Sequence, residues 1–450
     1  MSSDTASPST NAFVWGYNNT GGLGLGHTAR AYRPVPIRLP AGIVDVQAGV
    51  EFSVALTSSG ALYSWGGNGY GQLGDGSSKS RRKPGPVALP RNTKVTQIRV
   101  GTDHVLALTN HGQVLAWGRN HHGQIGNGSA QSQLAPLVVH SDTVSLGAGD
   151  ASSAAIDRRG ELYTWGRNGS GQLATRANLT KDVTRPALAV LPRGVKAAAV
   201  EAGRRHLTVL TTAGQLVMFG VDALGRPEHS QLTPKAAWGR IREISAGDDY
   251  TLALTSQNIL LAWGANHSGQ LGVGDLENRL TLAVVTLPRA GGRITAVAAG
   301  ARSAVAITSA HEVYAWGDST LGQCGLGRLS AGIQPKPTKL ASLDGATVTA
   351  VYGGGHHTIL TAVRGPAVGL RLDPQLATVR PGESVTYRVH AVDAFGTDLG
   401  PGSLGHVTLS ITHGEAVAKT ARASTPGAHQ VTARAGKLTG SATLVVKNGK

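Results

Sequence analysis

The sequence has one cysteine, Cys324, and only 4% Phe, Trp and Tyr in 450 residues. A single Cys cannot form an intramolecular disulfide, so cysteine usage does not indicate a redox compartment. No apolar run approaches the ~20 residues that a membrane-spanning helix needs. Only 15% of the residues are charged, and 450 residues are enough to form large hydrophobic cores. We therefore expect Cys324 to be a buried apolar residue rather than a reactive thiol.

Motifs of catalysis and metal binding are also missing. No HExxH, GxxxxGK[ST] or GxSxG segment occurs. The adjacent pairs His121-His122 and His356-His357 would point to opposite faces of a strand, which disfavours a metal site. We therefore expect a non-enzymatic protein with no metal and no other cofactor.

Acidic residues are outnumbered, and the formal net charge is +16, spread over the whole chain. Such a surface favours nucleic acid, anionic polymers or acidic proteins as partners, although it is also compatible with solubility alone. Residues 1–11 are polar and are expected to be disordered. They have no signal-peptide pattern. The alternative, that a leader has been removed, stays open.

A 28-residue segment recurs along most of the chain. It reads GVEFSVALTSSGALYSWGGNGYGQLGDG at 49–76, and it returns closely at 101 and 247 and more loosely at 300. An aromatic residue followed by Gly marks each copy, at Trp15, Trp65, Trp117, Trp165, Phe219, Trp263 and Trp316. Units of about 50 residues suit the four-stranded blade of a propeller better than a two-helix solenoid repeat.

Each unit has the composition of four short strands. Residues 53–57 and 61–65 are apolar runs joined by a tight turn, a third run such as 43–46 precedes them, and a fourth such as 86–89 starts at a Pro. The Trp is expected to lie in the core of its blade. The copy around Phe219 lacks the GQLG segment and is either a drifted structural blade or a specialised binding edge.

The first unit begins in the middle of a blade. Phe13–Gly16 is a Trp-Gly strand without the two strands that should precede it, and matching runs appear at 348–351 and 353–360. We predict that these runs complete the first blade and close the ring, so that no sheet edge stays open. The sequence thus predicts an all-β fold with a seven-bladed β-propeller at 12–363.

The repeat stops after residue 363. Runs at 370–372, 384–392, 406–411, 429–433 and 441–446 read as strands separated by turns rich in Gly, Pro and Asp. We predict that 364–450 forms a small β-sandwich of the immunoglobulin-like type.

Both parts resemble known families. The repeated G-x-x-[H]-x-x-A-L-T…W-G-x-N-x-x-G-Q-L-G over 13–363 resembles the regulator of chromosome condensation repeat, which implies a seven-bladed propeller. Members of that family include a guanine-nucleotide exchange factor and interaction domains of ubiquitin ligases and bacterial proteins. The segment 364–450, with PGES at 381–384 and VDAFG at 392–396, resembles bacterial immunoglobulin-like domains. That resemblance implies a spacer, and an extracellular or cell-surface location with a cytoplasmic one as the alternative.

The turn after each Ala-Gly holds residues that vary while the frame around them repeats. Seven such turns would form a ring on one face, a common way to build a binding surface. We predict a partner-binding site there, made of Glu51, Asp103, Asp150, Arg204, Arg205, Asp248, Asp249, Arg302 and His356.

In the exchange factor, acidic and His residues of these turns contact the GTPase, although its inserted wedge has no counterpart here. A secreted β-lactamase inhibitor with a related propeller carries aromatics in these turns, and this ring has none.

A second candidate surface is the basic loop Lys79, Arg81, Arg82 and Lys83. Four cations in five residues suit binding of a polyanion, such as an anionic surface polymer. The favoured interpretation is a charged loop with no partner. No aromatics are interleaved with them, which makes sequence-specific nucleic-acid recognition unlikely. The favoured function is a non-enzymatic protein-interaction scaffold. The alternatives are a guanine-nucleotide exchange factor for a small GTPase and a secreted enzyme inhibitor.

Overall fold

A computed structural model describes residues 9–175, 180–288, 290–328, 332–363, 369–392, 398–400 and 406–447. The chain divides into two compact units, residues 1–362 and residues 363–450. In the described ranges both units are built of β-strands, with short 3-10 segments such as η1 (Ala236–Trp238) and η3 (Ala341–Leu343). None of the helices in these ranges has the length and apolarity that crossing a membrane requires.

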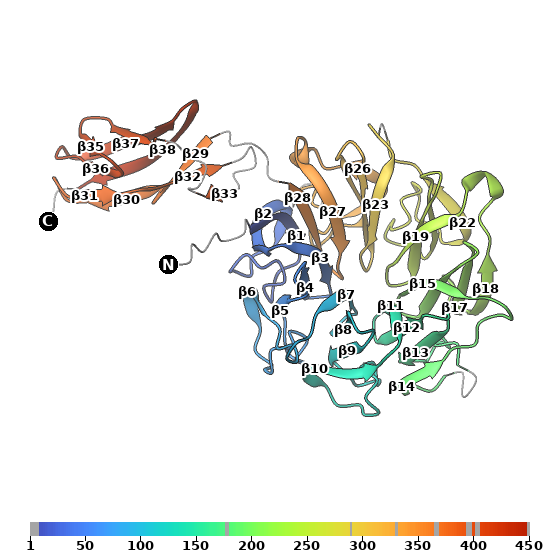
Figure 1. Ribbon diagram of the computed structural model, residues 1–450. Helices are drawn as coiled ribbons and strands as arrows, with labels where there is room; N and C mark the ends of the chain where they lie inside the picture. Colours follow the sequence, from blue (N-terminus) through green and yellow to red (C-terminus); the bar gives the residue numbers. More distant parts are fainter. Residues whose placement is uncertain are drawn as a thin grey trace. The chain divides into compact units, whose positions relative to one another are not determined.

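The described part of the first unit forms seven four-stranded antiparallel sheets, arranged around a centre (Figure 1). Six of them are continuous in sequence, and their strands run in order from the centre outward. One sheet contains β3 (Ile43–Ala48), β4 (Phe52–Thr57), β5 (Leu62–Gly66) and β6 (Arg81–Pro86). The next contains β7 (Val95–Val100), β8 (His104–Thr109), β9 (Val114–Gly118) and β10 (Gln133–His140). Two more are β11 (Thr143–Ala148), β12 (Ser152–Asp157), β13 (Leu162–Gly166), β14 (Val183–Leu188) and β15 (Ala197–Ala202), β16 (His206–Thr211), β17 (Leu216–Val221), β18 (Pro227–Leu232). The last two are β19 (Ile241–Ala246), β20 (Tyr250–Thr255), β21 (Leu260–Gly264), β22 (Arg279–Val285) and β23 (Ile294–Ala299), β24 (Ser303–Thr308), β25 (Val313–Asp318), β26 (Ile333–Lys339).

The seventh sheet joins the two ends of the propeller. Its order is β2 (Ala31–Ala41), β1 (Ser9–Gly16), β28 (His357–Val363) and β27 (Thr347–Gly353). β1 pairs with β28 from Asn11 opposite Ala362 to Gly16 opposite His357, which confirms the predicted closure. Because β1 begins at Ser9, residues 9–11 belong to a strand and not to a disordered end; residues 1–8 lie outside the described ranges.

In five of the seven blades, the Trp of the repeat makes a hydrogen bond to the preceding blade. The indole N–H of Trp117 donates to the backbone carbonyl of Gln72 at 3.0 Å, and Gln72 belongs to the GQLG loop of the preceding blade. Four other Trp residues do the same, at 2.8–2.9 Å: Trp15 to Gln323, Trp65 to Gly22, Trp165 to Gln124 and Trp316 to Gln270. All five are fully buried, as expected for core residues.

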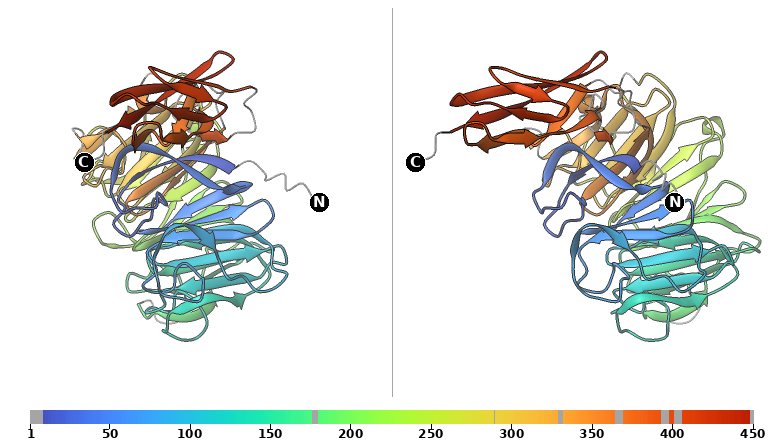
Figure 2. Two further views of the ribbon diagram at one scale, coloured as in Figure 1. Left: turned by 90° about the vertical axis from the view of Figure 1, so that its left-hand side faces the viewer. Right: turned by 60° about the vertical axis from the view of Figure 1, so that its left-hand side comes forward.

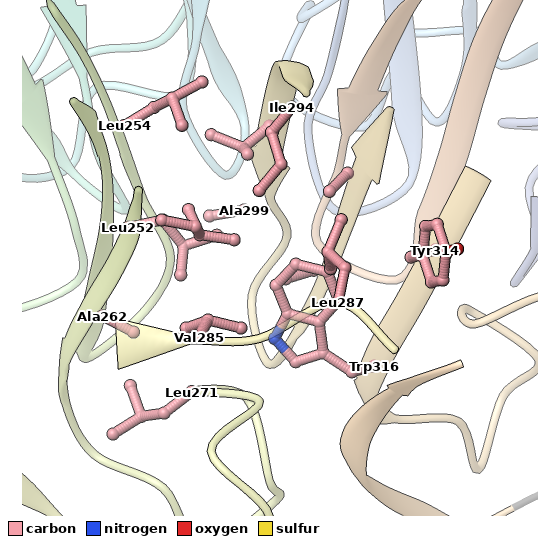
Figure 3. Packing of buried hydrophobic residues seen from close by; sticks show 14 of the residues in the cluster. Leu252, Leu254, Ala262, Leu271, Val285, Leu287, Ile294, Ala299, Tyr314 and Trp316 are labelled. Carbon is pink, nitrogen blue, oxygen red and sulfur yellow. The ribbon is translucent and has the colours of Figure 1, made fainter. Parts of the chain in front are cut away.

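Apolar side chains fill the space between neighbouring sheets around this hydrogen bond. In Figure 3 the ring of Trp316 lies among Val285 and Leu287 of the preceding blade, near Leu271 of its GQLG loop. In the last loop copy along the chain, Cys324 takes the Leu position; it is fully buried, and burial raises the pKa of its thiol to about 12. A thiol of that pKa stays protonated and unreactive at neutral pH.

The blade around Phe219 is the exception. β17 passes into β18 through the short turn 222–226, so the GQLG loop is absent. The next Trp, Trp263, has no loop carbonyl to reach, and its indole N–H lies 2.8 Å from the sulfur of Met218 instead. A thioether is a weak acceptor, so this junction keeps its packing but has a weaker hydrogen bond.

Buried histidines form a second set of contacts between blades. Nε2 of His104 lies 3.0 Å from the hydroxyl of Ser153, and Ser153 donates to the carbonyl of Gln124. His206 and His357 make equivalent contacts with Thr251 and Ser53 at 2.9 Å. Burial lowers the pKa of all three imidazoles to about 4, because a charged ring would lose its hydration.

The second unit contains three small sheets. β29 (Gly369–Asp373), β32 (Arg388–Val392) and β33 (Asp398–Gly400) form one; β30 (Leu376–Val379), β38 (Leu438–Val446), β37 (Gly427–Ala435) and β34 (Thr408–Ile411) form another; β31 (Ser384–Thr386), β36 (Thr420–Arg422) and β35 (Glu415–Val417) form the third. Figure 2 shows these strands (orange to red) lying in layers. They enclose one core that includes Leu372, Tyr387, Val431 and Leu444.

One expected strand of this unit is wrong. The run 384–392 is divided at Tyr387 between β31, which pairs with β36, and β32, which pairs with β29. Tyr387 is fully buried, and its backbone N–H donates to the carbonyl of Lys419 at 2.7 Å. The chain therefore changes sheets at the residue that enters the core. Most of the expected VDAFG turn lies outside the described residues.

We expect closure to decide whether the propeller folds. A chain ending at residue 366 keeps β27 and β28, whereas a chain ending at 346 loses both and leaves β1 with one open edge. Thermal melting should show a cooperative transition for the first and a much lower or absent one for the second. Equal melting temperatures for the two truncations would contradict the closure argument.

The buried histidines should make the protein acid-sensitive. Because their folded pKa is below the ordinary value, the unfolded chain binds more protons between about pH 4 and pH 6.5, so stability is lost as the pH falls through this window. At about pH 5 each histidine should cost roughly 2 kcal/mol of unfolding free energy.

Urea unfolding of wild type and His104→Gln at about pH 7 and pH 5 tests this. The variant should lose less stability on acidification than wild type does. The comparison separates the histidine from carboxyl groups such as Asp45 and Glu201, whose pKa burial raises and whose effect on stability has the opposite sign. An identical pH dependence of the two proteins would contradict the assignment.

Candidate functional site

The seven inner turns are joined into a circle by backbone hydrogen bonds. In each blade the N–H of the residue after Gly donates to a carbonyl of the equivalent turn in the next blade. The bonds are Val50 to Thr102, Thr102 to Asp150, Asp150 to Gly203, Arg204 to Asp248, Asp248 to Ala301, Ala301 to Gly354 and Gly355 to Gly49, at 2.6–3.4 Å. The turns are therefore held at fixed positions by the main chain alone.

Glycine allows this close approach. A Cβ on Gly101 would lie 2.3 Å from the carbonyl oxygen of Gly149, and one on Gly149 would lie 2.3 Å from that of Gly203. The circle surrounds a central opening of about 90 Å³, lined mainly by Ala, Val and Gly, with Asp150, Arg204 and Asp248 as its ionisable residues.

The structure brings the nine predicted site residues to one face. Asp150, Arg204 and Asp248 line the opening. The other six are Glu51, Asp103, Arg205, Asp249, Arg302 and His356, and each of them directly follows a residue that lines the opening. Arg204 and Arg302 are exposed, and the remaining seven are partly buried.

Several of the charges are already paired. Arg205 Nε donates to Asp249 Oδ1 at 2.9 Å, and the carboxylates of Asp103 and Asp150 lie 3.5 and 3.6 Å from Arg119 and Arg167. Burial raises the pKa of Asp103 and Asp248, and the neighbouring Asp249 raises that of Asp248 further. Partly desolvated charges of both signs give the face a fixed electrostatic pattern.

Sequence reasoning missed Arg119 and Arg167. Both follow Trp-Gly, and the backbone N–H of Arg119 donates to the carbonyl of Asp103 at 2.8 Å. The same bond joins Arg167 to Ala151 and Gly67 to Glu51. The residue after Trp-Gly therefore lies beside the second turn residue of its own blade. Because Trp-Gly recurs in six of the seven copies, its position in the repeat could have been used to predict that this residue belongs to the face.

The face also carries aromatics beside the turns. Arg119 lies over the ring of Tyr70 at 4.8 Å, and His121 meets that ring edge-on at 5.4 Å. Tyr17 meets His356 edge-on at 6.2 Å. Tyr70, Arg119, His121 and Asp103 form what we call the Tyr70 cluster. The prediction that the turns carry no aromatic residues is thus correct, but it does not describe the whole face, which includes Tyr17 and Tyr70.

Neither candidate histidine pair lies within a strand, in contrast to the expectation: residues 121–122 are in a turn, and His356 precedes β28, which begins at His357. His121 contacts Tyr70, whereas His122 Nδ1 lies 2.7 Å from Asp182. His357 is buried and His356 is at the face. Among the described residues, no group of three or more His, Cys, Asp or Glu side chains is arranged to hold a metal ion.

The basic loop does not act as a unit. Arg81 is used internally: it donates to Ser64, Gly85 and Pro86, and it lies 3.3 Å from Asp75. Arg81 is therefore partly satisfied by groups of its own blade, and binding of a polyanion by this loop stays a prediction. Lys79, Arg82 and Lys83 are exposed.

The first unit resembles known proteins over most of its length. The model of the regulator of chromosome condensation (RCC1) repeat matches six segments, 11–56, 59–108, 111–156, 159–210, 258–307 and 310–361. The ultraviolet-B receptor UVR8 of Arabidopsis thaliana is 33% identical over 352 residues, 74% of this chain and 78% of UVR8. Human E3 ubiquitin-protein ligase HERC2 is 28% identical over 83% of this chain but only 8% of its own length.

Two solved structures share the fold. Prp20p of Saccharomyces cerevisiae, studied for its binding to Gsp1p and histones, has a TM-score of 0.67 and 24% identity over 80% of this chain and 92% of its own. Human WBSCR16 has a TM-score of 0.67 and 21% identity, covering 78% of this chain and 98% of its own. With six matched repeats over more than half of its length, the chain belongs to the RCC1 repeat family.

Proposed function

We propose that the protein is a non-enzymatic interaction scaffold that binds a protein partner through the face of the seven inner turns. The observation that carries this proposal is the contrast within the turns. Their main chains form one closed hydrogen-bonded circle, while the side chains on it differ in every blade. A rigid frame that displays variable residues supports recognition of one particular partner.

The relatives support an interaction role without naming the partner. Their printed names include a receptor, a ubiquitin-protein ligase and a protein studied with Gsp1p and histones. Proteins with one fold and such different roles use different sites on it. The partner of this chain therefore has to be identified by experiment.

The Tyr70 cluster supports a centre for the interface. Tyr and Arg are enriched among residues that dominate binding energy, and here each fixes the other in place. Asp103 accepts from Gln72 Nε2 at 3.3 Å, which orients its carboxylate as well. A partner would thus meet a group whose side chains lose little freedom on binding.

The second unit is proposed to be an immunoglobulin-like spacer of residues 364–450. Its three small sheets around one core support this proposal. An extracellular or cell-surface location follows only from that resemblance and stays a prediction beside the cytoplasmic alternative.

Reversing exposed charges on the face should weaken binding. Arg204 and Arg302 are exposed, and neither lies in the core, so Arg204→Glu with Arg302→Glu should leave the propeller folded. The melting temperature should fall only slightly, because both cations lie near the carboxylate of Asp248. The double variant should lose about 1–3 kcal/mol of affinity for a partner captured with wild type, the scale of charged hydrogen bonds. Titration calorimetry with the purified partner measures this.

The matched control is Arg91→Glu with Arg193→Glu, two exposed cations elsewhere. It should bind like wild type. If the control loses as much affinity as the face variant, the partner does not bind through the inner turns. Tyr70→Ala, which removes no charge, should weaken the same partner.

An exchange factor for a small GTPase would use the same face. Asp103 and Asp249 already pair with arginines of the face, which leaves them less available to a GTPase. We expect no acceleration of nucleotide release from small GTPases of the source organism. Acceleration that is lost in Asp103→Ala or Asp249→Ala would replace the scaffold by an exchange factor.

A further inference from the structure

The outermost strands of four blades carry a cation followed by Pro at the same position. The pairs are Arg33-Pro34 in β2, Lys83-Pro84 in β6, Arg185-Pro186 in β14 and Lys336-Pro337 in β26. The residue before each cation accepts a backbone hydrogen bond from the last loop glycine of the preceding blade. These bonds are Gly327 to Tyr32, Gly26 to Arg82, Gly128 to Thr184 and Gly274 to Pro335, at 2.8–2.9 Å. The register of the cations is therefore identical.

Each cation lies across the glycine that fixes its register. A Cβ on Gly26 would meet Cε of Lys83 at 2.9 Å, and one on Gly274 would meet Cε of Lys336 at 2.8 Å. Arg33 and Arg185 cross Gly327 and Gly128 in the same way, at 3.0 and 2.6 Å. The packing holds the stem of each side chain, and all four residues are exposed. Less side-chain freedom is then lost when a ligand binds.

These cations are not used by the described part of the protein. The salt bridges of their strands involve other residues, Arg81 with Asp75 and Lys339 with Glu312 and Asp344. Among the described residues, Arg33, Lys83, Arg185 and Lys336 form no salt bridge. Four unpaired cations at one repeated position suggest a repeated external anion.

Three of the cations are consecutive around the propeller. β26, β2 and β6 are the outer strands of neighbouring blades, so Lys336, Arg33 and Lys83 form what we call the rim row. The next blade has Ala135-Pro136 in the same register, because Leu134 accepts from Gly76 at 3.0 Å. Nothing lies within 4 Å of a Cβ on Gly76. The row is therefore interrupted at Ala135 and resumes at Arg185.

More positive charge surrounds Arg33. It shares a cleft of about 480 Å³ with Arg30 and Arg328, and the described residues that line this cleft include no carboxylate. Arg30 lies over the ring of Tyr17 at 4.9 Å, and Arg328 over that of Tyr32 at 5.1 Å. Stacking on aromatic rings orients these guanidinium groups, which suit the oxygens of a phosphate.

The prolines exclude a peptide that adds as a strand. A Pro after each cation removes the N–H that a strand at this sheet edge would need. Recognition has to come from the charged side chains. The three cations lie on consecutive blades, so they span two of the seven blade-to-blade steps around a convex rim. A DNA duplex, with a persistence length of about 150 base pairs, would touch such a rim only locally.

A flexible polyanion can follow the rim. A single-stranded nucleic acid is flexible, but its bases gain affinity from free aromatic platforms. Lys83 and Lys336 are followed by prolines, and the tyrosines near Arg33 are stacked under arginines, Tyr17 under Arg30 and Tyr32 under Arg328. We propose that the rim row binds a flexible linear chain of phosphate groups, of which inorganic polyphosphate is the simplest. The site lies on the outer strands, apart from the inner turns of the proposed protein-binding face.

The salt dependence of polyphosphate binding to the full chain tests the proposal. The logarithm of affinity should fall linearly with the logarithm of salt between about 50 and 200 mM, by roughly 0.7–0.9 for each phosphate neutralised. Changing Lys336, Arg33 and Lys83 together to Gln should reduce this slope by roughly 2–3. Ala135→Lys, which fills the gap, should increase the slope by roughly 1 and tighten binding.

The matched control removes the same charge elsewhere, with Arg91, Arg158 and Arg193 changed to Gln, all exposed. It should keep the wild-type slope, and melting temperatures should show that all variants fold. If the control loses as much slope as the triple variant, binding reflects only the net charge of +16, and the rim row is not a site. An unchanged slope in Ala135→Lys would contradict the row as well.

Duplex DNA and heparin distinguish other ligands. Both should bind more weakly than polyphosphate at equal charge and respond less to the triple variant. If DNA binds equally well and loses the same slope, the ligand is a nucleic-acid backbone and the assignment of a phosphate chain is wrong. If heparin does so, the ligand is a sulfated polymer. Neither outcome affects the partner captured through Arg204 and Arg302.

Discussion

A hydrogen bond from a Trp indole to a backbone carbonyl of the preceding blade fixes the position of one blade against the next. The bond forms only because the GQLG loop turns its carbonyl into the space between two sheets. It also needs a glycine: a Cβ on Gly74 would lie 2.6 Å from the indole nitrogen of Trp117. The turn, the small residue and the aromatic residue therefore depend on one another, which explains why they recur together.

The Phe219 blade shows what happens when one part of this set is absent. Without the loop, Trp263 remains buried at 2% exposure and turns its N–H to the sulfur of Met218. The inner turns still close at this blade, because Arg204 donates to Asp248 at 2.6 Å. The circle of main-chain bonds thus tolerates a defect in the Trp contact, and the frame of the binding face is preserved where the repeat has drifted.

Much of the fold could be predicted from the sequence, because one pattern repeats and each repeat has to satisfy the same backbone. The Trp-Gly strands, the four-stranded blades and the closure through residues 347–363 follow from spacing alone. The divided strand at Tyr387 could not be predicted, because alternation along 384–392 is the same whether one sheet or two receive it. The candidate face was located, but its aromatic and cationic neighbours were not. Tyr70 and Arg119 come together from loops of adjacent blades, and local sequence does not show that distance.

The separation of frame and surface accounts for a family whose members have different named roles. In this chain the circle at the centre uses N–H and C=O groups, and the ties between blades use Trp, His and Gly that are buried. None of these contacts uses the charged ends of Glu51, Arg204 or Arg302. A substitution at those positions therefore changes the potential of the face without removing a contact that holds the blades together. The same reasoning applies to the rim row. Ala135 takes the strand position that a cation occupies in the row, and the backbone hydrogen bond from Gly76 to Leu134 still forms. Both surfaces can therefore change independently of the fold and of each other.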